Sequence, residues 1–172
     1  MKEHKGMRPH DIAILLKIAS KGKREWFMKD IAFELGISSS EVSESINRSS
    51  IAGLISNNKR TLNKLALLDF LSCGLQYVYP QRPGAIVRGI GTAHSAAPLN
   101  EFIESSECFV WPYAEGNMRG QAIEPLHHKI PEACIKDEKF YELMALADAI
   151  RVGSSREKKL AVELIKDRIN NA

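Results

Sequence analysis

The fold is decided by a stretch near the N-terminus, from Asp30 to Ile55, which reads DIAFELGISSSEVSESINRSSIAGLI. Apolar residues recur at helical spacing on both sides of Gly36, and a glycine there permits a sharp turn of the backbone. Ser38 is followed three residues later by Glu41, a capping box that predicts a second helix directly after the turn. The stretch therefore predicts two short helices joined by a tight turn.

The same residues meet the packing demands of a helix pair whose second helix protrudes. A small residue, Ala32, stands where the two helices would cross, and an apolar residue, Val42, would hold the second helix inward. A preceding segment predicts a first helix on which the pair can pack, because its apolar residues repeat at helical spacing: Ile12, Leu15, Leu16 and Ala19.

With these positions in this order, the stretch resembles the helix-turn-helix of the MarR-type winged-helix transcriptional regulators, including the closing AGLI that leads toward the wing. The resemblance covers about the first third of the chain, Pro9 to Ile55. It implies double-stranded DNA as partner, with a recognition helix from about Ser39 to Ala52 in the major groove. It also implies the exposed surface of that helix: Ser38, Ser39, Ser40, Ser43, Glu44, Asn47 and Arg48.

The chemistry of these residues suits base and phosphate contacts, with Arg48 able to read guanine through two hydrogen bonds. Two departures from the family stand out. Ser49 occupies a position that is usually apolar, and a helix predicted from Thr61 to Ser72 separates AGLI from the next hairpin.

That hairpin is predicted from Leu75 to Gly91, where β-branched and aromatic residues flank the turn sequence QRPG. It could serve as the wing, with Arg82 at its tip, or be an ordinary surface turn. Charge for DNA affinity must come from residues beside the recognition helix, since the first 94 residues hold 14 Lys or Arg against 8 Asp or Glu and the rest 10 against 13. The candidates are Lys23, Arg24, Lys29, Lys59, Arg60, Lys64 and Arg82.

Taken as a whole, the sequence predicts an α+β protein of two parts, residues 1–94 and 95–172. Thr92 to Pro131 shows no sustained period and is expected to be irregular with one or two short strands. Two amphipathic helices follow, from Asp137 to Val152 and after a capping box at Ser154. The family resemblance implies that such terminal helices form a homodimer; alternatively, they cover the middle of the same chain.

Other function classes lack their signatures in this sequence. Neither a nucleotide-binding glycine loop nor a catalytic arrangement is apparent, so we expect no enzyme and no cofactor. His94, His127 and His128 have no ligand-like spacing with Cys or carboxylates, so no metal site is predicted. The three cysteines are odd in number and far apart, which favours buried thiols. No membrane span or secretory signal is apparent, and a cytoplasmic location is expected.

The sequence thus predicts a sequence-specific DNA-binding transcriptional regulator. The main alternative is a winged helix that docks a protein partner instead of DNA. A further alternative is a DNA-binding module whose C-terminal half senses a ligand or protein effector, for which Trp111, Tyr113 and Arg119 are the candidate lining residues, although aromatic residues of this kind are more often core.

Overall fold

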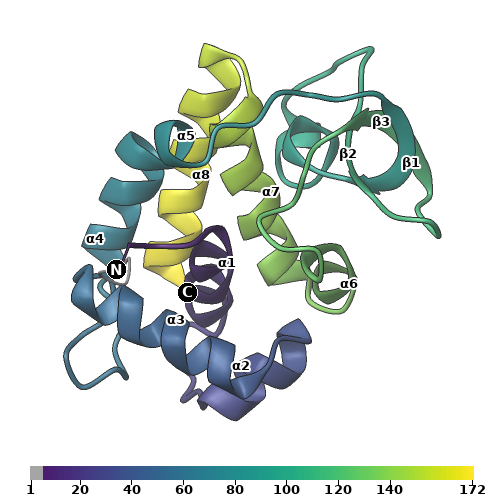
Figure 1. The fold of residues 1–172 in the computed structure, drawn as a ribbon. Coiled ribbons are helices and arrows are strands. Elements are labelled where there is room, and N and C mark those ends of the chain that lie inside the picture. Colours follow the sequence, from purple (N-terminus) through teal and green to yellow (C-terminus); the bar gives the residue numbers. More distant parts are fainter. Residues whose placement is uncertain (1–5) are drawn as a thin grey trace.

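The computed structural model describes residues 6–172 as a mixed α+β fold (Figure 1). Three helices gather at one end: α1 (Pro9–Ser20), α2 (Met28–Leu35) and α3 (Ser39–Ile51). The long helices α7 (Glu138–Val152) and α8 (Ser155–Asn171) rise side by side from them toward the opposite end, and a small sheet lies to one side. Within the described residues, no helix is long and apolar enough to cross a membrane.

The predicted helix pair is confirmed, together with the chemistry that ends one helix and begins the next. Gly36 terminates α2 in the left-handed region, with φ of 64°. The hydroxyl of Ser38 then accepts a hydrogen bond of 3.2 Å from the backbone N–H of Glu41, which caps α3. Ile31, Leu35, Val42 and Ile46 are fully or almost fully buried, so the pair packs through the apolar face that the sequence indicates.

A very short hairpin follows α3 directly. Ile55 and Leu62 form an antiparallel bridge, and the backbone N–H of Ser56 donates to the carbonyl of Thr61 at 2.8 Å. The tip residue Lys59 has a positive φ of 57°. We refer to residues 55–62 as the α3 hairpin. No pattern in the sequence predicted this hairpin.

The prediction of a hairpin from Leu75 to Gly91 is wrong. Its first half continues a helical segment made of α4 (Lys64–Asp69), a π-helical turn (Phe70–Gly74) and α5 (Leu75–Val78). Leu67, Leu71 and Leu75 are buried at intervals of four residues, which is helical spacing, and their burial outweighs the β-propensity of the tyrosines and valine that follow.

The second half of that predicted hairpin is a true strand, β1 (Ile86–Gly91), but its partners come from later in the chain. It pairs antiparallel with both β2 (Phe109–Pro112) and β3 (Met118–Ala122), which are parallel to each other, and the three strands close into a small barrel. Gly89 makes the closure feasible, because a Cβ there would overlap the carbonyl oxygen of Trp111. The predicted boundary after residue 94 thus separates strands that pair with one another.

The rest of the middle segment contains two 3-10 turns, Ala93–Ser95 and Leu99–Glu101, and a short helix, α6 (Ile130–Ile135). A buried charged group attaches the sheet to α7. The carboxylate of Asp148 accepts hydrogen bonds from Trp111 Nε1 at 2.6 Å, Thr92 Oγ1 at 2.9 Å and Arg151 at 2.7 Å. Trp111 is fully buried, so it belongs to the core and does not line a ligand surface.

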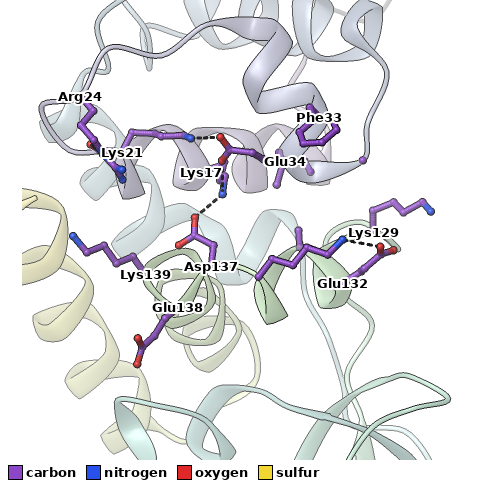
Figure 2. A pocket seen from close by; sticks show the side chains of 14 residues that line it. Lys17, Lys21, Arg24, Phe33, Glu34, Lys129, Glu132, Asp137, Glu138 and Lys139 are labelled. Carbon is purple, nitrogen blue, oxygen red and sulfur yellow. Dashed lines mark hydrogen bonds and ion pairs between the residues drawn. The ribbon is translucent and has the colours of Figure 1, made fainter.

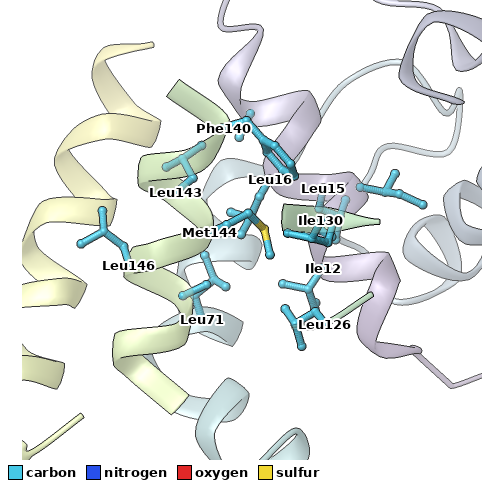
Figure 3. Close-up of a cluster of buried hydrophobic side chains, with 14 of the residues drawn as sticks. Ile12, Leu15, Leu16, Leu71, Leu126, Ile130, Phe140, Leu143, Met144 and Leu146 are labelled. Atoms are coloured by element: carbon cyan, nitrogen blue, oxygen red, sulfur yellow. The ribbon is translucent and has the colours of Figure 1, made fainter. Parts of the chain in front are cut away.

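One hydrophobic cluster joins both predicted parts of the chain. Around α7 it brings together side chains of α1, the helical segment before β1, α6 and the α7 helix itself (Figure 3): Ile12, Leu16, Leu71, Ile130, Phe140 and Met144. On α8, Ala161, Ile165 and Ile169 are buried in the same cluster. Burial within the chain accounts for the apolar stripes of both terminal helices, and the homodimer stays a prediction.

Candidate nucleic-acid interface

The solvent-facing side of α3 is polar. Ser39, Ser40, Ser43, Glu44 and Asn47 are exposed, as predicted for the recognition surface. Ser38 is also exposed, but its hydroxyl accepts the capping hydrogen bond and lies 3.2 Å from the hydroxyl of Ser40. The face therefore offers serine hydroxyls, one amide and one carboxylate, with no basic side chain of its own.

Arg48 is the exception, and its predicted role in reading guanine is wrong. Its side chain is 9% exposed and donates two hydrogen bonds to Asp11 on α1, from Nε to Oδ2 at 2.8 Å and from Nη2 to Oδ1 at 2.7 Å. Nη2 also lies 3.3 Å from Nε2 of His10. The guanidinium is thus committed to holding α3 against α1.

The electrostatics of this pair are those of a buried ion pair. Burial would raise the pKa of Asp11, but hydrogen bonds from Arg48, the Arg8 backbone and Ser45 outweigh it and leave that pKa below its ordinary value. The hydrogen bond to Asp11 in turn raises the pKa of Arg48. The sequence carried one signal for the pair, an acidic residue inside the apolar pattern of the first helix.

Ser49 is buried, so the position is inward-facing as it is in the resembled family. Its hydroxyl has no hydrogen-bond partner among the described residues. Serine at residue 49 therefore fills an apolar position at some cost in packing and polar satisfaction.

The α3 hairpin lies against the C-terminal half of α3. The ammonium of Lys59 donates to the side-chain oxygen of Asn47 at 3.1 Å, and the hydroxyl of Ser50 donates to the carbonyl of Ser56 at 3.3 Å. The first of these contacts places Lys59, a predicted site residue, beside the polar face of α3, and the neighbouring predicted residue Arg60 is exposed. The missed signal was the asparagine pair at residues 57 and 58, which is turn chemistry.

Behind the hairpin, further predicted cations converge. Lys23, Arg24, Arg60 and Lys64 line a groove of about 300 Å³ between the α1–α2 connection and the hairpin, with Trp26 in its wall and Glu25 as the single carboxylate. Lys29 stands apart from this group on α2, its ammonium 5.9 Å from the ring of Phe27.

Arg82 does not join them. It is exposed in the connection between α5 and β1, which crosses the end of the molecule opposite to α3 (Figure 1). Its placement at a wing tip depended on the Leu75 to Gly91 hairpin, and that hairpin does not form. Arg82 is therefore not part of the surface around α3.

A larger groove, of about 770 Å³, separates α1 and α2 from α6 and α7 (Figure 2). Its floor is a charge network in which the buried ammonium of Lys17 contacts Glu34 at 2.8 Å and Asp137 at 2.5 Å, while Lys21 also pairs with Glu34. Burial would raise the pKa of Glu34 and of Asp137, but the hydrogen bonds from Lys17 outweigh it and lower both. These pairs fix the helix pair against α7.

Comparison of the chain with family models, with curated proteins and with solved structures gives no significant match. Within residues 6–172, no group of three or more His, Cys, Asp or Glu side chains is placed to hold a metal ion.

Proposed function

We propose that the chain is a sequence-specific double-stranded DNA-binding protein that acts as a transcriptional regulator. In this proposal α1, α2, α3 and the α3 hairpin form a winged helix-turn-helix of the MarR type, with α3 as recognition helix and the hairpin as wing. The observation that carries the proposal is the exposed polar face of α3, bordered by a hairpin that presents Lys59 and Arg60.

The helix α3 and the surrounding cations have different roles in this proposal. An α-helix with side chains is about 10–12 Å across and the major groove is about 12 Å wide, so α3 can enter it. Serine hydroxyls and backbone N–H groups at the start of α3 suit phosphate contacts, as does the positive end of the helix dipole. The cations of the hairpin and of the adjoining groove supply attraction that α3 itself lacks.

Base discrimination then falls to Asn47. Its amide is exposed in the middle of the polar face, and within the part of the chain that the structure describes it has one hydrogen bond, from Lys59 to its oxygen. An asparagine amide can pair with adenine through two hydrogen bonds. Ser40 and Ser43 lie on the same face and can bond either bases or phosphates.

A protein partner is the second candidate, because α3 also exposes an acidic and an apolar side chain. The side chain of Glu44 is 68% exposed, and Ile51 is 59% exposed at the end of the helix. Both would be unusual contacts for a polyanion, whereas a protein surface accepts them readily.

Selection from a randomised duplex library separates the two candidates. We expect the unaltered chain to enrich a defined motif, and Asn47→Ala to lose preference at one base-pair position at a cost of about 1–3 kcal/mol. Arg156→Ala is the control and should enrich the same motif, because it changes an exposed arginine on α8 that has no ion-pair partner among residues 6–172. Absence of any enriched motif with the unaltered chain would reject the sequence-specific proposal.

A further inference from the structure

A segment from the C-terminal part of the chain lies beside α3. The ring of His127 contacts that of His10 edge-on, with centroids 5.8 Å apart, and His10 Nε2 is 3.8 Å from Glu41 Oε1 in the first turn of α3. The aliphatic stem of Lys129 packs over the turn between α2 and α3, since a Cβ built on Gly36 would lie 3.7 Å from its Cδ. Residues 127–129 thus border the N-terminal half of α3.

This border and the α3 hairpin lie on opposite sides of the helix. Ser50 faces the hairpin, whereas Glu41 and Arg48 face α1 and residues 127–129. At 100° per residue, Ser50 is about 160–180° around the helix axis from these two side chains. The exposed residues Ser40, Asn47 and Glu44 form the ridge between the two borders.

The available charge on this second border belongs to Lys129. Its ammonium makes no ion pair or hydrogen bond with any of residues 6–172, unlike the neighbouring Lys136, which pairs with Glu132 at 3.0 Å. Burial lowers the pKa of His127, so that ring adds no positive charge near neutral pH. Lys129 lies at the end of the large groove near Phe33 and Glu132 (Figure 2).

We propose that Lys129 contacts the DNA phosphate backbone on the side of α3 opposite to the α3 hairpin. The inference rests on the proposed function. A helix in the major groove lies between two phosphate backbones, so each border of α3 meets one of them. The C-terminal part of the chain then contributes directly to DNA binding, and bound DNA fixes the position of residues 127–129 relative to the α3 hairpin.

The charges on α3 explain why a cation is needed there. Glu44 lies on the ridge, with 68% of its side chain exposed. Glu41 lies on the side facing residues 127–129, with 39% of its side chain exposed. A phosphate backbone approaching that side meets like charge. The hairpin cations are on the far side of the helix, and at an ionic strength of 0.15 M charges are largely screened beyond about 8 Å. On the border made by residues 127–129, the lysine that can supply an opposing positive charge is Lys129.

The test is the salt dependence of binding to a random-sequence duplex, measured by fluorescence anisotropy for the unaltered chain and five variants of it. We expect Lys129→Ala to reduce the slope of log Kd against log salt by about 0.9, one lost phosphate contact, and to weaken binding roughly five- to tenfold at 0.1 M salt. Lys129→Arg should retain the slope of the unaltered chain. The matched control is Lys159→Ala, which changes an exposed lysine near the start of α8; that end of the helix lies away from α3 (Figure 1).

The outcomes distinguish this inference from the function on which it rests. If Arg60→Ala reduces the slope and Lys129→Ala leaves it unchanged, DNA binding stands and the second contact is rejected. If the unaltered chain does not bind DNA at all, both fail. If both single variants reduce the slope and the double variant shows the sum of the two effects, the contacts are independent and lie on separate phosphates. Circular dichroism of each variant confirms that the fold is retained.

Discussion

The ion pair between Arg48 and Asp11 joins α3 to α1 where water is excluded. Truncation of Arg48 to Ala leaves the Asp11 carboxylate buried without its partner. Breaking a buried ion pair in this way costs about 3–5 kcal/mol. We therefore expect Arg48→Ala to lower the free energy of unfolding by about that amount, measured by urea denaturation followed by circular dichroism.

The control for Arg48→Ala is Arg156→Ala, which removes an exposed arginine that has no ion-pair partner among the described residues. It should change the unfolding free energy by less than about 0.5 kcal/mol. If Arg48→Ala were equally neutral, the pairing with Asp11 would not hold α3 in place and the residue would again be a candidate for base contact.

Three buried or half-buried carboxylates make the fold sensitive to acid. Burial would raise the pKa of Asp11, Glu34 and Asp137, but hydrogen bonds from Arg48 or Lys17 outweigh it and lower each pKa. A pKa that is lower in the folded state contributes stability above the unfolded value of about 4, and that contribution is lost as pH falls further. We expect the urea midpoint to fall gently between pH 7 and 5, because burial lowers the pKa of His10 and His127 in the folded state, and to fall steeply below about pH 4.

Asp11→Asn provides the comparison for this acid dependence. It removes one of the three titrating groups, so its urea midpoint should fall less steeply below pH 4 than that of the unaltered chain, although the variant is less stable at pH 7. An unaltered chain that loses most of its stability between pH 7 and 5 would contradict the assignment to these carboxylates.

At the scale of elements, the turn between α2 and α3 depends on Gly36. Its φ of 64° is in the left-handed region, where a side chain costs about 1–2 kcal/mol, and an added Cβ would meet only ordinary contacts with Lys129. We expect Gly36→Ala to lower the thermal midpoint by several degrees. Gly84→Ala, at a glycine without positive φ and with ordinary contacts, should leave the thermal midpoint unchanged.

The helix pair could be predicted because its signals are local. The turn glycine, the capping serine and the apolar spacing all lie within Asp30 to Ile55 and agree with one another. The segment after it was misassigned because local signals conflict. Tyr77, Val78 and Tyr79 favour a strand, whereas Leu67, Leu71 and Leu75 have helical spacing, and the core decides between them.

The α3 hairpin escaped prediction for a different reason. It contains a single bridge, between Ile55 and Leu62, and is too short for an alternating pattern. The predicted cation Lys59 still lies beside α3, because it is close to that helix in sequence, and Arg60 follows it in the hairpin. Arg48 could not be assigned from sequence, since its helix position alone does not tell whether α1 or solvent covers that side.

At the scale of the whole molecule, α8 belongs to the core of its own chain. Ile165 is fully buried in the cluster that includes α1 and α7, so Ile165→Glu places a charge in an apolar site and should cost more than about 4 kcal/mol. We expect loss of cooperative unfolding for this variant. Its neighbour Lys166→Glu, which is exposed, should fold normally.

The oligomeric state of the unaltered chain and of Ile165→Glu, measured by light scattering, provides a second test of this prediction. A folded Ile165→Glu monomer obtained from a dimeric unaltered chain would contradict the burial of α8 within the chain and support an intermolecular role. The sheet and the Asp148 cluster could not be predicted from the sequence, because β1 pairs with strands about 20–35 residues away and Asp148 meets Thr92 and Trp111 only in the folded chain.

The central claim, that α3 and its hairpin bind the DNA backbone and groove, is tested most directly by the salt dependence of DNA affinity for the unaltered chain and for the double variant Lys59→Ala, Arg60→Ala. We expect a linear loss of affinity in log–log coordinates for the unaltered chain and a slope reduced by about 1.8 in the double variant, since two phosphate contacts are removed. Binding that is absent, or that is equally salt-dependent in both proteins, would contradict it.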